Sequence, residues 1–110
     1  MNGKPLRWIH SEVKTPPMSV AARREIGLHL RELQDGNQPS MPHSRPMPTI
    51  GVRCHELRVN DVNKTWRVIY RTDEDAIVVL DVFEKKTNRT PPQVIANCQR
   101  RLKLYEANRP

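Results

Sequence analysis

Three consecutive segments of this chain combine a strand-like apolar pattern with regularly placed basic residues. The segments cover residues 54–59, 66–71 and 76–87. They carry Arg58, Arg67 and Lys85, which can converge on one phosphate if the strands are neighbours in a sheet. An arginine guanidinium binds phosphate through two parallel hydrogen bonds, and fixed cations stabilise the charge that develops in phosphoryl transfer. The spacing therefore points to phosphate chemistry.

Side chains alternate between the two faces of a sheet, so the parity of each position assigns it to a face. The apolar face contains Leu57, Val59, Trp66, Val68, Tyr70, Val78, Leu80 and Val82. The opposite face contains Glu56, Arg58, Arg67, Arg71, Asp81, Phe83 and Lys85, with Ile77 and Val79 at its inner end. On this second face, Phe83 can stack on an unpaired base beside the cations. The alternative interpretation is a solvated face held by cross-strand ion pairs.

The remaining sequence predicts the elements that must position these strands. We expect a strand at residues 6–13, a helix at residues 19–35, a proline-rich connection at residues 37–53 and a helix at residues 91–107. The first helix is indicated by apolar residues at helical spacing after a Ser19 N-cap. The last is indicated by Thr90 as N-cap and Pro91 at the first helical position. The prolines of the connection disfavour both helix and central strand.

The composition favours an anionic partner. The 110 residues include 19 Lys and Arg against 12 Asp and Glu, which gives a net charge of +7. Such a charge favours nucleic acid, an acidic protein or an anionic membrane, although it also raises solubility by itself. The two cysteines and four histidines lack metal-ligand spacing, so we expect no metal site. No apolar run approaches the ~20 residues of a membrane span, so we expect a cytoplasmic protein.

A series of short motifs resembles the RelE/ParE toxin superfamily. The motifs are MPHSRPM at residues 41–47, ELR at 56–58, WRVIY at 66–70, VFEKKT at 82–87 and TP at 90–91. Within the superfamily, their order and gaps are most similar to the HigB-like branch, which includes phage-derived Gp49-like proteins.

The resemblance implies an α+β fold, in which an antiparallel sheet of about four strands carries helices packed on one face. It implies that residues 1–110 form a single RelE/HigB-like toxin domain. The implied function is the toxin of a type II toxin–antitoxin system, a ribosome-dependent mRNA endoribonuclease that needs no metal or cofactor. The implied partners are mRNA on the ribosome and a helix-turn-helix antitoxin of the HigA/XRE-like type, with no membrane.

The resemblance also assigns roles to individual residues. The catalytic cations carry over to Arg58, Arg67, Lys85 and Lys86. Glu56 and His43 are the candidates for the general base. Arg71, Phe83 and Arg45 are expected to contact RNA.

Two other functions fit the same sequence. A ParE-like inhibitor that binds gyrase would need the fold but not the cation cluster. A non-catalytic RNA-binding prophage remnant would need the cations but no proton acceptor.

Overall fold

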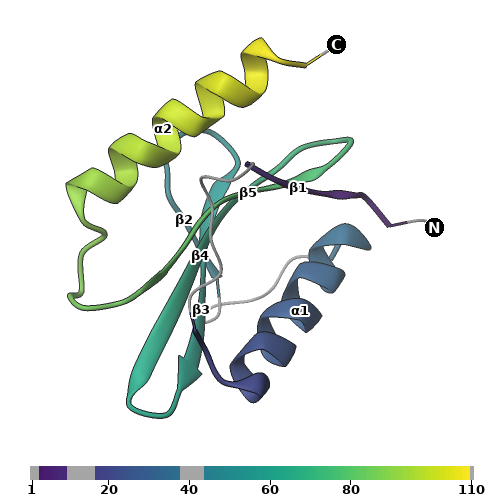
Figure 1. The fold of residues 1–110 in the computed structure, drawn as a ribbon. Helices are drawn as coiled ribbons and strands as arrows, with labels where there is room; N and C mark the ends of the chain where they lie inside the picture. Colours follow the sequence, from purple (N-terminus) through teal and green to yellow (C-terminus); the bar gives the residue numbers. More distant parts are fainter. Residues whose placement is uncertain (1–2, 10–16, 38–43, 110) are drawn as a thin grey trace.

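A five-stranded sheet forms the centre of the computed structural model, which describes residues 3–9, 17–37 and 44–109 (Figure 1). The strands are β1 (Leu6–Trp8), β2 (Ser44–Pro46), β3 (Cys54–Asp61), β4 (Lys64–Thr72) and β5 (Ile77–Glu84), and the helices are α1 (Val20–Gln34) and α2 (Pro92–Ala107). The strand order is β1-β5-β4-β3-β2. The predicted α+β class is confirmed, with five strands where about four were expected.

The three central strands form an antiparallel meander, as the sequence predicts. Short turns join β3 to β4 and β4 to β5, and chain segments with such short connections pair as antiparallel neighbours. Asn63, in the first turn, has a φ of 60°, a conformation that asparagine adopts more readily than most residues. The register places Arg58 opposite Arg67, and Arg67 opposite Phe83.

The two outer strands are short and differ from the sequence predictions. β1 pairs in parallel with β5. Of the predicted strand 6–13, Leu6–Trp8 is a strand, Ile9 is not, and residues 10–13 lie outside the described ranges. β2 lies within the predicted proline-rich connection and pairs antiparallel with β3. Pro46 is tolerated there because an edge strand does not need every backbone N–H for pairing.

Helix α1 follows its sequence signals closely. The Ser19 hydroxyl accepts a hydrogen bond from the Ala22 N–H at 3.0 Å, which confirms the predicted N-cap. The buried positions are the four predicted ones, Ala22, Ile26, Leu30 and Leu33. The helix contacts β3 and β5, where Ile26 and Leu30 share an apolar cleft with Val82. It therefore covers the apolar sheet face.

Helix α2 lies on the opposite side of the sheet, so the expectation of helices on one face is wrong (Figure 1). Its Arg101 guanidinium lies 3.4 Å from the Asp81 carboxylate, and Asp81 points away from the face of its neighbour Val82. The physical reason is charge compensation, because α2 supplies the counter-charges that let part of the charged face be buried. In the described ranges, no helix is long and apolar enough to cross a membrane.

An irregularity in β5 corrects part of the parity assignment. Ile69 pairs with Asp81 whereas Tyr70 pairs with Val79, which leaves Leu80 as the extra residue of a β-bulge. Alternation is interrupted there. Val78 consequently lies opposite Arg71 on the charged face, and Val79 lies opposite Tyr70 on the apolar face. The sequence assignment had these two valines reversed, and it also placed Ile77 on the charged face, whereas Ile77 lies opposite Thr72 on the apolar face.

Asp61, at the end of β3, links the start of α1 to the sheet. One carboxylate oxygen accepts hydrogen bonds from the Ser19 backbone N–H at 3.0 Å and from the Trp66 indole N–H at 2.9 Å. The other accepts from the Val62 N–H at 2.7 Å. The Ser19 N–H above all, and then the Trp66 indole, hold the pKa of Asp61 far below its ordinary value.

Replacing Asp61 with asparagine is expected to lower the free energy of unfolding at neutral pH. The carboxyl has a lower pKa in the folded state, so the unfolded chain binds its proton first as the pH falls. The contribution of Asp61 is therefore complete above the unfolded pKa of about 4 and is lost as the pH falls toward the folded pKa. Urea unfolding of both proteins between pH 2 and 7 measures the difference.

Asp35→Asn is the matched control, because Asp35 is exposed and reaches Arg31 only at 3.9 Å. We expect little effect from it at any pH. A deficit in Asp61→Asn that stays constant down to pH 2 would contradict the assigned role of the carboxylate.

Candidate nucleic-acid interface

The sheet register brings three of the sequence-predicted site residues into one row. Arg58 on β3, Arg67 on β4 and Phe83 on β5 lie directly opposite one another on the charged face. The Lys85 backbone N–H donates to the Thr65 carbonyl at 2.7 Å, which continues the β4–β5 pairing past the end of the strand. Lys85 lies two residues after Phe83 and therefore on the same side.

Arg67 is buried in the middle of this row, with 1% of its surface exposed. Its guanidinium lies 3.2 Å from the Glu56 carboxylate and donates to the carbonyls of Thr87 and Asn88, each at 3.3 Å. Burial lowers the pKa of Arg67, and the Glu56 carboxylate opposes this shift. Through its two terminal nitrogens Arg67 fixes the 87–90 segment to the sheet, while its buried Nε has no hydrogen-bond partner among the described residues.

Glu56 is fully buried and is shared among three donors. The Arg45 guanidinium reaches one carboxylate oxygen at 3.1 Å, while Arg67 and the Thr90 hydroxyl reach the other at 3.2 and 3.1 Å. A general base must come within hydrogen-bond reach of the substrate proton. Glu56 is enclosed by its own partners, so its observed role is to neutralise two arginines. The other base candidate, His43, lies outside the described residues.

Thr90 has a different role from the one predicted for it. Helix α2 begins at Pro92 with Pro91 as its N-cap residue and has no side-chain cap hydrogen bond. The Thr90 hydroxyl instead donates to Glu56 and accepts from Arg67 at 3.5 Å. A buried carboxylate competes successfully for this hydroxyl because an unsatisfied buried charge is costly.

Four cations remain at least partly exposed around the buried Arg67–Glu56 pair. We call them, together with the half-buried Phe83, the basic surface: Arg45, Arg58, Lys85, Lys86 and Phe83. Arg45 is paired with Glu56. Arg58, Lys85 and Lys86 make no ion pair with any residue of the described ranges. Their charges are therefore available to an anionic ligand.

A polar cleft of about 320 Å³ adjoins the basic surface at the β3–β4 turn. Lys64 lines it together with Lys85 and Lys86. The Lys64 ammonium also lies 5.5 Å from the centre of the Trp66 ring. The sequence analysis did not select Lys64. Its position in the hairpin turn, beside the KKT motif once β4 and β5 pair, is the signal that could have identified it.

Arg71 does not join the basic surface. It is buried where α2 covers the sheet, and its guanidinium reaches Asp73 and Glu106, each at 2.7 Å. Tyr105 of α2 stacks over the same guanidinium at 5.8 Å. Arg71 therefore holds α2 on the sheet. Because Arg71 is buried in this conformation, RNA cannot reach it for the predicted contact.

The part of the chain that the structure describes contains no group of three or more His, Cys, Asp or Glu side chains that could hold a metal ion. Both cysteines are buried, and burial raises the pKa of Cys54 to about 11 and of Cys98 to about 12. Both thiols are therefore protonated at neutral pH and unreactive. The chemistry available at this site is charge stabilisation by fixed cations.

Replacing Glu56 with glutamine is expected to destabilise the fold by about 3 kcal/mol, because it leaves the buried Arg67 without its counter-charge. Arg45→Gln should cost about 1 kcal/mol, since Arg45 is partly exposed and solvent screens the lost pair. Urea unfolding at pH 7 measures both.

Glu74→Gln is the control for the charge change, because Glu74 is exposed and makes no ion pair in the described ranges. It should unfold at the same urea concentration as the unaltered protein. Equal unfolding midpoints for Glu56→Gln and Glu74→Gln would show that the buried network does not stabilise the sheet.

Comparison with known protein families gives one match over most of the chain. The family model described as "Phage derived protein Gp49-like (DUF891)" matches residues 17–103. The matched range includes α1, the whole meander and most of α2, and with them every residue of the basic surface. No curated protein matches the chain.

Proposed function

The chain belongs to the Gp49-like family of phage-derived proteins, and from this premise we propose that it is the toxin of a type II toxin–antitoxin system. Its proposed activity is cleavage of mRNA on the ribosome. The observation that carries the proposal is the basic surface, where Arg58, Lys85 and Lys86 are free of ion pairs within the described ranges and Phe83 lies in the same strand register. A protein with this net charge is also attracted to ribosomal RNA before any specific contact forms.

The proposed reaction is internal transesterification of RNA. The ribose 2′-oxygen attacks the adjacent phosphorus, a bond forms between them, and the bond from phosphorus to the 5′-oxygen breaks. The products are a 2′,3′-cyclic phosphate and a 5′-hydroxyl, so one proton leaves the 2′-hydroxyl and one reaches the departing oxygen. The step needs no metal, provided that cations stabilise the additional negative charge on the phosphoryl oxygens.

The positions of the residues suggest separate roles in this reaction. Arg58, in the row on β3, and Lys85, just after the end of β5, lie on the same face and can bind the scissile phosphate. Lys86 and Lys64 line the adjoining cleft, which suits the next phosphate of the strand. Phe83 supplies a stacking surface for a base. Arg67 is a positioning residue in this scheme, since it fixes the loop that carries the two lysines.

The proposed partners follow from the same family membership. The substrate is mRNA in the ribosomal decoding site, and the neutralising partner is a helix-turn-helix antitoxin.

A second function is favoured by one specific observation. Among the described carboxylates of this sheet face, Glu56 is enclosed by arginines and Asp81 is paired with Arg101, while the neighbouring Glu84 lies opposite Trp66 on the other face. A protein that binds RNA on the ribosome without cutting it would require only the cations. A gyrase inhibitor would not require the basic surface, and nothing in this arrangement favours one.

Replacing Arg58 or Lys85 with alanine is expected to reduce mRNA cleavage about 100-fold each, because removing one preorganised charge-stabilising donor has an effect of this size. Primer extension after pulsed expression measures new 5′ ends within codons, and growth arrest gives the parallel cellular readout. Thermal unfolding of the purified variants checks that the fold is kept.

Arg24→Ala is the matched control, because it removes the same kind of charge from an exposed position on α1. It should cleave as the unaltered protein does. Full cleavage by both Arg58→Ala and Lys85→Ala would overturn the proposed site. Salt-sensitive ribosome binding by the unaltered protein, without new mRNA ends, would instead establish the non-catalytic function.

A further inference from the structure

The outer edge of β1 is an unpaired sheet edge in the part of the chain that the structure describes. The Pro5 carbonyl accepts a hydrogen bond from the Ile77 N–H at 3.0 Å, so this carbonyl faces β5. Backbone groups of successive strand residues point in opposite directions, which turns the N–H and C=O groups of Leu6 and Trp8 outward. None of these outward groups has a hydrogen-bond partner among the described residues.

The strand is held firmly at its start. The Lys4 N–H donates to the Gln34 carbonyl at 2.7 Å, and the Gln34 side-chain amide donates back to the Lys4 carbonyl at 2.7 Å. The Lys4 ammonium also donates to the Asp73 carbonyl at 2.9 Å. These bonds fix the strand between α1 and the β4–β5 turn, so its outer edge is preorganised for pairing.

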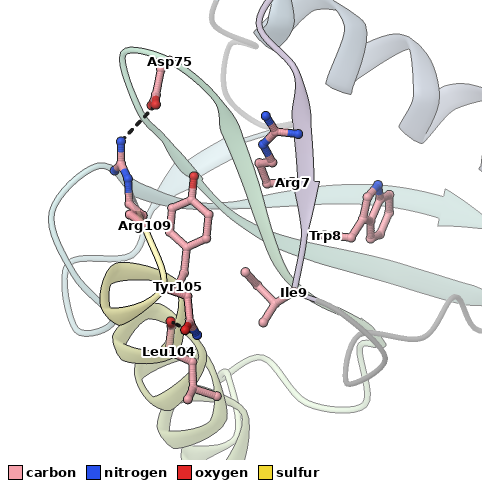
Figure 2. A pocket seen from close by; sticks show the side chains of 8 residues that line it. Arg7, Trp8, Ile9, Asp75, Leu104, Tyr105 and Arg109 are labelled. Atoms are coloured by element: carbon pink, nitrogen blue, oxygen red, sulfur yellow. Dashed lines mark hydrogen bonds and ion pairs between the residues drawn. The ribbon is translucent and has the colours of Figure 1, made fainter.

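A cleft lies on each side of this edge. The first, of about 450 Å³, lies between β1 and the end of α2, where Ile9 points toward Leu104 and Tyr105 (Figure 2). The half-exposed Trp8 lies at its border with its ring turned away from α2. The second, of about 250 Å³, lies on the α1 side and is lined mainly by apolar groups of Leu6, Met18, Ile26 and Val82. Trp8 borders both clefts. Side chains of an added strand would alternate between the two.

Each cleft has a basic rim. Arg7 and Arg109 border the first cleft (Figure 2), and Arg23 borders the second. Arg109 is paired with Asp75 at 2.9 Å, whereas Arg7 and Arg23 make no ion pair within the described ranges. An occupant with apolar side chains at its centre and carboxylates at its flanks matches this distribution.

We propose that β1 is a docking site for an extended acidic and apolar peptide segment of a partner protein, which adds to the sheet as a sixth strand. Backbone pairing with Leu6 and Trp8 supplies affinity, and the two clefts select alternate side chains, as in other strand-addition complexes. The site is separate from the basic surface, since β1 pairs with Ile77–Val79 at the start of β5, whereas Phe83 and Lys85 lie at its other end.

A peptide fits this edge better than a nucleic acid does. The edge offers both N–H donors and C=O acceptors, and a peptide strand supplies the complement of both. The phosphates of a nucleic acid only accept hydrogen bonds, so they do not match the carbonyls of the edge. The apolar lining of the α1-side cleft also suits aliphatic side chains rather than phosphates.

The proposal is tested with the acetylated, amidated heptapeptide DELVIED, which carries three apolar residues between acidic flanks. Amide NMR of the isotope-labelled protein should show saturable shifts at Leu6, Arg7 and Trp8, with slower hydrogen exchange of the Leu6 and Trp8 amides. The same peptide N-methylated on all its backbone nitrogens is the matched control. It keeps every side chain but cannot pair with the strand, so it should not bind.

A charge-reversal pair tests the basic rim. Arg7→Glu should weaken binding about fivefold, the effect of one exposed ion pair. Arg24→Glu, which changes the same charge on α1 outside both clefts, should leave binding unchanged. The proposal is overturned by equal binding of the N-methylated peptide, by no saturable shift up to millimolar peptide, or by shifts of the β1 amides with an oligouridylate and not with the peptide.

Discussion

The buried contact between Arg67 and Glu56 is the constraint on which the rest of the charged sheet face depends. Arg58 and Arg67 lie directly opposite each other, and like charges in this arrangement repel. Glu56 is fully buried beside them and neutralises Arg67 while also binding Arg45. Breaking a buried pair by removing one partner is far more costly than never having formed it. The network therefore commits β2, β3, β4 and the 87–90 segment to one arrangement.

The same sheet face serves two purposes along its length. Near Asp81 and Arg71 it is interior, because Arg101 and Glu106 of α2 compensate the charges and the helix excludes water. Around the row of Arg58, Arg67 and Phe83 no helix covers it, and Arg58, Lys85 and Lys86 make no ion pair within the described ranges. The 87–90 segment lies between these regions and is fastened by Arg67. The charged sheet face is thus part of the core where a helix supplies counter-charges. Where no helix does so, it is a surface available to a ligand.

Parity and helical periodicity predicted the meander, the buried face of α1 and the row of site residues. These succeed because alternation and the 3.6-residue repeat follow from backbone geometry alone. They fail where geometry is locally broken or where distant groups compete. The bulge at Leu80 shifts the alternation of β5. β2 was not predicted because prolines argue against a strand, although an edge strand tolerates them. The sequence predicts Thr90 as a helix cap, but its hydroxyl donates instead to Glu56, which lies 34 residues away in the chain. The burial of Arg67 was not predicted either, because parity assigns a side chain to a sheet face but does not show which distant segment covers it.

The parallel pairing of β1 with β5 has a consequence for the order in which the protein folds. The meander is built from hairpins of strands adjacent in sequence, whereas β1 pairs with β5 through residues as far apart in the chain as Leu6 and Ile77. Contacts between residues far apart in sequence cost more chain entropy to form and slow folding. We therefore expect β3, β4 and β5 to assemble first, and the N-terminal strand to dock on a sheet that already exists. The parallel edge made by β1 is then the last part of the sheet to form, and the bonds of Lys4 to Gln34 and Asp73 secure it only once α1 and the meander are in place.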